Sequence, residues 1–263
     1  MEWSLKNLSP HAIRLSKKVF FFYKSSHAVS LPSDPIREII PYRHPLARVA
    51  VGCLPYALKH RFLRFVVTER IVEYPFVWRQ LDLPSGATVL DLGATGSKLA
   101  LELAVAGYQV IAVDVLAYPF SHPNLRSWRG DFLANSLPAD SLDAVVAVST
   151  IEHMGIPYYG GPSVPDGDRR ALREIWRLLK PGGRLLLTVP YGQAAQTAHQ
   201  RVYDEPSLRA LLEPFEVDVL CFYRRQDAQQ WAPADAAAMR SVSSTQQTEG
   251  VALVRARKPA NVG

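Results

Sequence analysis

The sequence predicts a doubly wound α/β domain over residues 81–263, and three observations lead to this prediction. Apolar runs alternate with stretches of helical periodicity from Leu81 onward. The apolar runs are rich in Val, Ile and Leu and show no alternation between polar and apolar positions. Glycine-bearing or acidic turns follow several of these runs. Strands of this kind are buried on both faces, as in a parallel sheet covered by helices on both sides.

The elements of this domain are read from the position of each run. The expected strands are 87–92, 108–115, 125–130, 142–149, 183–190, 216–223 and 250–258. Helical periodicity marks residues 98–106, 168–179 and 205–212. The segment 224–248 is rich in Gln, Ala and Ser, and its pattern assigns no definite element.

Residues 1–80 lack this alternation and are expected to form a basic, α-rich extension or lid. Prolines divide the segment, and the best candidate helices are 11–23, 46–51 and 56–73. The segment carries 13 Lys and Arg residues against 5 Asp and Glu residues. We expect this basic surface either to be solvated or to contact anionic lipid or a phosphorylated or lipid-linked acceptor. No RNA-binding module or dense basic tract is visible, so a nucleic-acid partner is not expected.

The remaining composition places the chain among ordinary globular proteins. Two cysteines, Cys53 and Cys221, provide neither a disulfide framework nor a zinc cluster. The apolar runs near the N-terminus are shorter than the roughly 20 residues that span a bilayer, and no signal-peptide pattern is present. We therefore expect a cytoplasmic protein that is soluble or peripheral to a membrane.

Carboxylates follow three of the first four expected strands, at Asp91, Asp114 and Asp131. Because the carboxyl ends of parallel strands meet at one edge of a sheet, these side chains should lie near one another. They favour a ligand with hydroxyls, an amine and a positive centre. Asp114 is placed to accept hydrogen bonds from a ribose diol, and the alternative is that it only caps the following helix.

The turn after the first strand reads DLGATGSKLA and fits neither common nucleotide fingerprint. A dinucleotide turn anchored on Gly93 requires glycines where the chain has Thr95 and Lys98. A phosphate loop of the Walker type has no match either.

The turns and their order resemble those of class I S-adenosylmethionine-dependent methyltransferases of the type 11 kind. VLDLGATGSKLA is similar to the first motif of that family, IAVDV to the second and RGDF to the third. STIEHM is similar to the motif after the fourth strand, and REIWRLLKPGGRLLLTVP to the Leu-Lys-Pro-Gly-Gly turn and fifth strand of the family. The resemblance covers about two thirds of the chain. It implies a Rossmann-like sheet of seven strands with the last one antiparallel, and S-adenosylmethionine as cofactor.

The resemblance also implies which residues contact the cofactor. Asp91 and Gly93 would line its methionine end, Asp114 would hold the ribose, and Asp131 with Phe132 would flank the adenine. The family has glycines at the positions of Thr95 and Ser97, so the path of this turn stays open. The full set of expected cofactor contacts is Asp91, Gly93, Ala94, Thr95, Gly96, Asp114, Val115, Asp131, Phe132 and Ser149.

His153 is the candidate general base, because a neutral imidazole after the fourth strand would accept a proton near pH 7. The alternative is a structural, hydrogen-bonded histidine. Some relatives bind a metal with Glu-x-x-Glu-His, but here Ser149 holds the first position, so no metal is expected. An Asn/Asp-Pro-Pro-Tyr motif is absent as well, which argues against a DNA adenine enzyme.

Two loops are the candidate acceptor site, 155–168 and 191–205. They supply the expected acceptor contacts Tyr158, Tyr159, Tyr191, Arg201 and Tyr203. Segments such as YPFSHPNL and QRVYD are similar to those of methyltransferases of glycan or surface-polysaccharide biosynthesis. The expected reaction is methyl transfer to a hydroxyl oxygen of a small molecule or glycan. The alternatives are an RNA methyltransferase and a cofactor-binding protein without catalysis.

Overall fold

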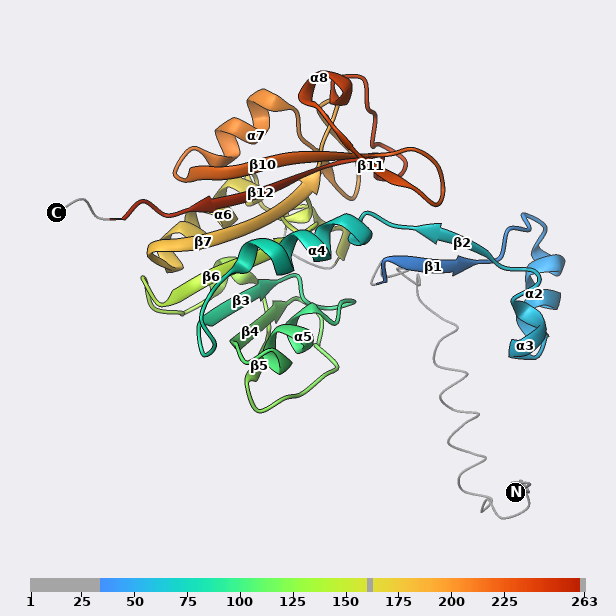
Figure 1. Ribbon diagram of the computed structural model, residues 1–263, viewed down its shortest axis with the longest axis horizontal. Coiled ribbons are helices and arrows are strands. Elements are labelled where there is room, and N and C mark those ends of the chain that lie inside the picture. The colour runs from blue at the N-terminus through green and yellow to red at the C-terminus, as the bar shows by residue number, and fades with distance from the viewer. Residues whose placement is uncertain (1–33, 160–162, 261–263) are drawn as a thin grey trace, which may run out of the picture. The chain divides into compact units, whose positions relative to one another are not determined.

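The computed structural model describes residues 34–159 and 163–260 and contains a central mixed sheet (Figure 1). The strands of this sheet are β3 (Thr88–Leu92), β4 (Gln109–Asp114), β5 (Leu125–Arg129), β6 (Leu142–Val148), β7 (Leu179–Pro190), β10 (Glu216–Arg225), β11 (Trp231–Ala234) and β12 (Gly250–Arg257). Their order across the sheet is β11-β10-β12-β7-β6-β3-β4-β5.

The sheet has the predicted direction of strands. Strand β3 pairs in parallel with β4 and β6, and the parallel arrangement extends to β5 and β7. The last strand, β12, inserts antiparallel between β7 and β10. All seven expected strands are therefore present, and the fold class is confirmed. The eighth strand, β11, comes from the unassigned segment 224–248 and pairs antiparallel with β10 at the sheet edge.

Helices cover both faces of the sheet. One face packs against α4 (Arg70–Leu81) and α5 (Leu99–Val105), and the other against α6 (Gly167–Leu178) and α7 (Glu205–Leu212). Strand β3 serves both layers, because Val89 belongs to the α4–α5 core while Leu90 and Leu92 belong to the α6–α7 core. The apolar strand runs in the sequence follow from this burial on two sides.

The described part of the N-terminal extension is a short ribbon that carries two helices. Strands β1 (Ile36–Ile39) and β2 (Arg64–Val67) pair antiparallel, and α2 (Pro45–Cys53) and α3 (Tyr56–Lys59) lie between them in the chain. The expected helix at 46–51 is thus confirmed as α2. The expected helix at 11–23 lies outside the described residues.

The predicted continuous helix over 56–73 is wrong. Helix α3 ends at Lys59, and the chain then becomes a strand before α4 begins at Arg70. Phe65, Val66 and Val67 have side chains that favour a strand, and β1 supplies the pairing partner. Helix α4 runs across residue 80 and buries Leu81 in the main core. The division of the chain between residues 80 and 81 stays a prediction.

The short elements lie at turns of the domain. They are η2 (Phe132–Ala134), η3 (Ile151–His153), η4 (Pro157–Tyr159), β8 (Ala195–Gln196), β9 (Arg201–Val202) and α8 (Ala236–Met239). The chain places β4 and β5 on one side of β3, and β6 and β7 on the other. This reversal creates a switch point at the carboxyl ends of β3 and β6, where α/β sheets bind ligands. None of the helices in the described residues is long and apolar enough to cross a membrane.

Candidate functional site

Asp91 lies next to the last residue of β3 and is almost completely buried, with 3% of its surface exposed. Its Oδ2 atom has no hydrogen-bond partner among the described residues. Burial, followed by the negative charge of Asp114, raises the pKa of Asp91 to about 7, while the nearby Arg70 acts in the opposite direction. A buried carboxylate oxygen without a partner carries a large desolvation cost. An N–H or cationic group of a ligand would remove that cost.

The turn after β3 has two residues in the left-handed region, Gly93 with φ +78° and Gly96 with φ +86°. A Cβ on Gly93 would lie 2.2 Å from Oγ1 of Thr150, so this position also needs glycine for space. The Ser97 hydroxyl accepts a hydrogen bond from the backbone N–H of Leu99 at the start of α5. The glycines at 93 and 96 thus shape the turn that the sequence left open.

Asp114, at the end of β4, holds this turn in place. Its Oδ2 accepts from the backbone N–H of Thr95 at 2.9 Å, and its Oδ1 accepts from the backbone N–H of Leu116 at 2.9 Å. A carboxylate oxygen has two lone pairs, so both atoms retain acceptor capacity for hydroxyl donors. No helix follows Asp114 before β5, so it caps none; it bonds the turn after β3 and its own following segment, and remains able to bind a diol.

Asp131 follows β5 and begins the short helix η2. Its Oδ1 accepts from the backbone N–H of Leu133 at 3.0 Å, while the neighbouring Phe132 is buried in the core. The backbone of the turn is thereby fixed.

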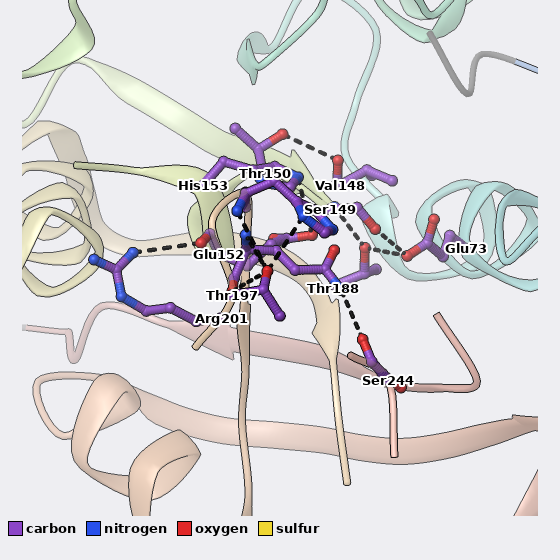
Figure 2. Close-up of polar contacts among 12 residues, drawn as sticks. Glu73, Val148, Ser149, Thr150, Glu152, His153, Thr188, Thr197, Arg201 and Ser244 are labelled. Carbon is purple, nitrogen blue, oxygen red and sulfur yellow. Dashed lines mark hydrogen bonds and ion pairs between the residues drawn. The ribbon is translucent and has the colours of Figure 1, made fainter. Parts of the chain in front are cut away.

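A carboxylate from the N-terminal segment enters the site from α4 (Figure 2). Oε1 of the fully buried Glu73 accepts from the Ser149 hydroxyl at 2.7 Å and from the Thr188 hydroxyl at 2.7 Å. Its Oε2 pairs with Nη1 of Arg70. Ser149 itself has a left-handed backbone, with φ 43°. Helix α4 is thus joined to the ends of β6 and β7 through one carboxylate.

Arg70 and Glu73 were not identified from the sequence. The signal available was a charged pair three residues apart in RIVEYPFVW, where the surrounding residues are mostly apolar. Such a pair is also common on solvated helix surfaces, so the pattern alone does not indicate burial.

His153 lies in η3, directly after β6, beside the buried Glu152 (Figure 2). Its Nδ1–H donates to the backbone carbonyl of His199, and its Nε2 lies 3.8 Å from Oε1 of Glu152. Burial lowers the pKa of His153 to about 4, so the imidazole is neutral at pH 7. Burial also raises the pKa of Glu152 well above its usual value. The other oxygen of Glu152, Oε2, has no hydrogen-bond partner within the described part of the chain.

Parts of this chain are similar to a family model and to curated proteins. Residues 131–255 match the model of a family described as "Caenorhabditis protein of unknown function, DUF268". A ubiquinone biosynthesis O-methyltransferase of Xanthomonas oryzae pv. oryzae is 33% identical over 127 residues, which cover 44% of this chain and 48% of that protein. A demethylmenaquinone methyltransferase of Corynebacterium efficiens is 36% identical over 117 residues, which cover 41% of this chain and 46% of that protein. The chain spans about half the length of these curated relatives.

Among solved structures, a methyltransferase of Methanosarcina mazei that is described as SAM-dependent has a TM-score of 0.50 and 18% identity. The match covers 72% of this chain and 99% of that one. The chain has the fold of the class I S-adenosylmethionine-dependent methyltransferases.

In this class I methyltransferase fold, the residues expected to contact the acceptor differ in their surroundings. Tyr158 is 54% exposed, and its ring lies 5.6 Å from the ring of His199. The backbone of Tyr159 ends η4, and its side chain is outside the described structure. Tyr191 and Tyr203 are instead part of the hydrophobic core.

The hydroxyl of Tyr203 donates to Oδ2 of Asp168 at 2.9 Å, and Nε of Arg201 lies 3.6 Å from the same oxygen. Arg201 also donates to the backbone carbonyl of Glu152 at 3.3 Å and to that of Met154 at 2.8 Å. Arg201 and Tyr203 thus hold the η3 segment against α6 and β9. Of the expected acceptor contacts with described side chains, Tyr158 is the one at the surface.

Glu73 brings a carboxylate to Ser149, at the position where Glu-x-x-Glu-His relatives have their first glutamate. Arg70 occupies the other oxygen of that carboxylate. Across residues 34–159 and 163–260, no three His, Cys, Asp or Glu side chains are grouped so as to hold a metal ion.

Proposed function

We propose that this class I methyltransferase fold transfers a methyl group from S-adenosylmethionine to a hydroxyl oxygen of a small molecule. The observation that supports the proposal most strongly is the buried Oδ2 of Asp91 at the switch point, which has no hydrogen-bond partner in residues 34–159 and 163–260. The amino group of the methionine end would supply its missing hydrogen bond. Asp114 would accept the ribose hydroxyls, and Asp131 with Phe132 would flank the adenine.

The charges around the site fit a cofactor that carries both positive and negative groups. Asp91 and Asp114 offer negative charge, while Arg70 is close enough to Asp91 to lower its pKa. We assign Arg70 to the carboxylate of the methionine end, and Glu73 to the orientation of Arg70. The buried position of this pair keeps the guanidinium in one geometry.

When bound, the cofactor would supply a methyl group on a positively charged sulfur, and the sulfur would leave as a neutral thioether when the methyl carbon is transferred to the acceptor oxygen. The chain then has to align the acceptor oxygen, exclude water and accept the hydroxyl proton. Nε2 of His153 is the proposed acceptor of that proton, because Nδ1 already donates to the carbonyl of His199. The same hydrogen bond fixes the tautomer and the plane of the ring.

The low pKa of His153 favours a particular class of acceptor. An imidazole with a pKa of about 4 is a weak base, and it removes a proton most effectively from an acidic hydroxyl. A phenolic hydroxyl has a pKa of about 10 and is far more acidic than the hydroxyl of a sugar. We therefore propose a phenolic ring as the acceptor, in agreement with the quinone-related names of the curated relatives. Tyr158 and His199 would contact that ring.

The experiment that tests this function has a binding part and a turnover part. S-adenosylhomocysteine should raise the melting temperature of the full chain, and Asp114→Ala should remove most of that increase. Labelled methyl groups from S-adenosylmethionine should appear on catechols and hydroxylated quinone precursors. Absence of a melting shift would refute the cofactor assignment. Label on nucleotide sugars or on RNA instead of phenols would refute the acceptor class, and binding without any turnover would indicate a non-catalytic protein.

A further inference from the structure

The helices of the N-terminal extension present an apolar surface that nothing in the described structure covers. We name the exposed side chains of residues 45–65 the α2–α3 surface. Its large apolar members are Leu46, Val49, Tyr56, Leu58, Phe62 and Phe65. The exposed fraction is 73% for Leu46, 63% for Val49 and 70% for Tyr56, so most of each side chain lies in solvent. Contiguous exposed apolar groups of this kind mark interaction sites.

The apolar residues of α2 share one side of the helix. Leu46, Val49 and Cys53 occur at positions i, i+3 and i+7, all of them exposed, while Val51 is the buried residue of this helix. The uncovered stripe is therefore a regular feature of the helix and not a single misplaced residue.

The charge around this surface has one sign. Residues 39–68 contain five Lys and Arg residues and no Asp or Glu. The cations are Arg43, Arg48, Lys59, Arg61 and Arg64. None of these five forms an ion pair with a carboxylate of the described chain. A partner with dense negative charge would therefore complement the surface without competition from internal pairs.

We propose that the α2–α3 surface docks on an anionic phospholipid bilayer. Interfacial helices combine an apolar stripe, which enters the acyl boundary, with cations that contact the headgroups. The exposed aromatic residues Tyr56, Phe62 and Phe65 suit the same boundary. Nucleic acid would attract the cations but would leave the aliphatic side chains Leu46 and Val49 in water. The mixture of both features favours lipid.

The surface is connected to the candidate site through a short and anchored path. Strand β2 ends at Val67, and α4, which carries Arg70 and Glu73, begins two residues after Thr68. The backbone carbonyl of Val67 accepts from Nη1 of Arg225 at 2.9 Å and from Nε1 of Trp231 at 3.0 Å. Docking would thus hold the catalytic domain beside the membrane. If the proposed phenolic acceptor carries an apolar chain and lies in the membrane, docking brings the protein close to that acceptor. This consequence rests on the proposed function.

The test is co-sedimentation of the full chain with phospholipid vesicles. Vesicles of phosphatidylcholine with phosphatidylglycerol should bind the protein, and vesicles of phosphatidylcholine alone should bind it far less. The variant Leu46→Ser/Val49→Ser should weaken binding at least about tenfold. Arg48→Ser should weaken it roughly fivefold and reduce its dependence on salt.

Two matched variants serve as controls. Val105→Ser removes a valine of α5 that is 67% exposed, and Arg209→Ser removes an exposed cation of α7. Both should leave vesicle binding unchanged. The melting shift with S-adenosylhomocysteine should be the same in all four variants and the parent, which separates this proposal from the cofactor assignment.

Four results would overturn the proposal. The first two are that the protein binds neither kind of vesicle, or binds both kinds equally. The third is that all variants bind the anionic vesicles equally. The fourth is that the protein binds single-stranded RNA in a way that needs Arg48 but not Leu46 and Val49. A dimer in light scattering that Leu46→Ser/Val49→Ser converts to a monomer, without vesicle binding, would instead identify a second copy as the partner.

Discussion

The hydroxyl of Ser149 donates a hydrogen bond of 2.7 Å to Oε1 of Glu73, across 76 positions of the sequence. The same oxygen receives the hydroxyl of Thr188, and Arg70 pairs with the other oxygen. Glu73 is thus the point at which the N-terminal segment, β6 and β7 meet. Its carboxylate is buried and fully paired, which is the condition under which a buried charge is tolerated.

Glu73→Ala should destabilise the protein strongly. It leaves the Arg70 guanidinium buried without its carboxylate, a change that typically costs about 3–5 kcal/mol of unfolding free energy. Urea denaturation measures this cost. Glu102→Ala, which removes an exposed glutamate of α5, should change the unfolding free energy by less than about 0.5 kcal/mol. A similar small effect of both variants would show that the Glu73 network does not hold α4 to the sheet.

Asp91→Asn should raise the stability of the unliganded protein at pH 8 and abolish the binding of S-adenosylhomocysteine. Because the pKa of Asp91 is raised from 3.8 to about 7 in the folded protein, its contribution to stability is present below pH 3.8 and is lost as the pH rises through 7. The amide cannot ionise, so the unliganded variant should melt at least ~2 °C above the parent at pH 8, with a smaller difference at pH 4. The melting shift with S-adenosylhomocysteine should disappear. A variant that retains this shift would contradict the role assigned to Oδ2.

His153→Gln should lower kcat for methyl transfer by about 10²-fold or more, while the affinity for S-adenosylhomocysteine stays within about twofold. Turnover measurements and calorimetric titration provide the two values. A parallel loss of both would assign His153 to structure.

The pH dependence of the unfolding free energy gives an independent measure of the pKa of His153 in the folded protein. Its pKa falls from 6.5 to about 4 on folding, so the unfolded chain binds this proton first. The stabilising contribution is complete above pH 6.5 and is lost as the pH falls toward 4. His153→Gln should flatten the stability curve between these values, as followed by urea denaturation at several pH values. A curve unchanged by the substitution would mean that His153 titrates normally in the folded protein.

Gly93→Ala tests the turn after β3. The new Cβ would meet Oγ1 of Thr150 at 2.2 Å, in a backbone with φ +78°. Gly86→Ala is the matched control, because Gly86 has φ +85° with nothing within 4 Å of the added Cβ. Both variants should lose about 1–2 kcal/mol from the left-handed backbone, and Gly93→Ala should lose further stability and the cofactor shift. Equal losses would mean that Thr150 moves aside without cost.

The sequence predicted the positions of the strand-end carboxylates better than those of the side chains expected to contact the acceptor. Asp91, Asp114 and Asp131 could be placed because parallel strands bring their carboxyl ends to one edge, so position along the chain determines position in space. Glu73 could not be found in this way, because its partners Ser149 and Thr188 are 76 and 115 residues away and no periodic pattern links them. Tyr191 and Tyr203 follow a strand end as expected, yet their rings fold into the core. Sequence position alone does not distinguish a side chain that points toward the site from one that points into the core.

The secondary structure was also predicted less well where it depends on contacts between distant parts of the chain. Strands β3, β6 and β12 are mostly apolar because two helical layers bury them, whereas β2 and β11 are short edge elements of four residues each. Their strand state comes from pairing with β1 and β10. Such elements depend on tertiary partners, and local propensity is a weak guide to them.

The backbone carbonyl of Val67 can gain its two side-chain hydrogen bonds only late in synthesis of the chain. Its two side-chain donors, Arg225 and Trp231, are added 158 and 164 residues after it. While the ribosome is still making the central sheet, neither donor exists, and the ribbon of β1 and β2 has no final attachment. The long sequence separation makes this contact one of the last to form. Maturation of the ribbon of β1 and β2 is therefore coupled to completion of the β10–β11 hairpin, and a chain that ends before Arg225 would lack both donors.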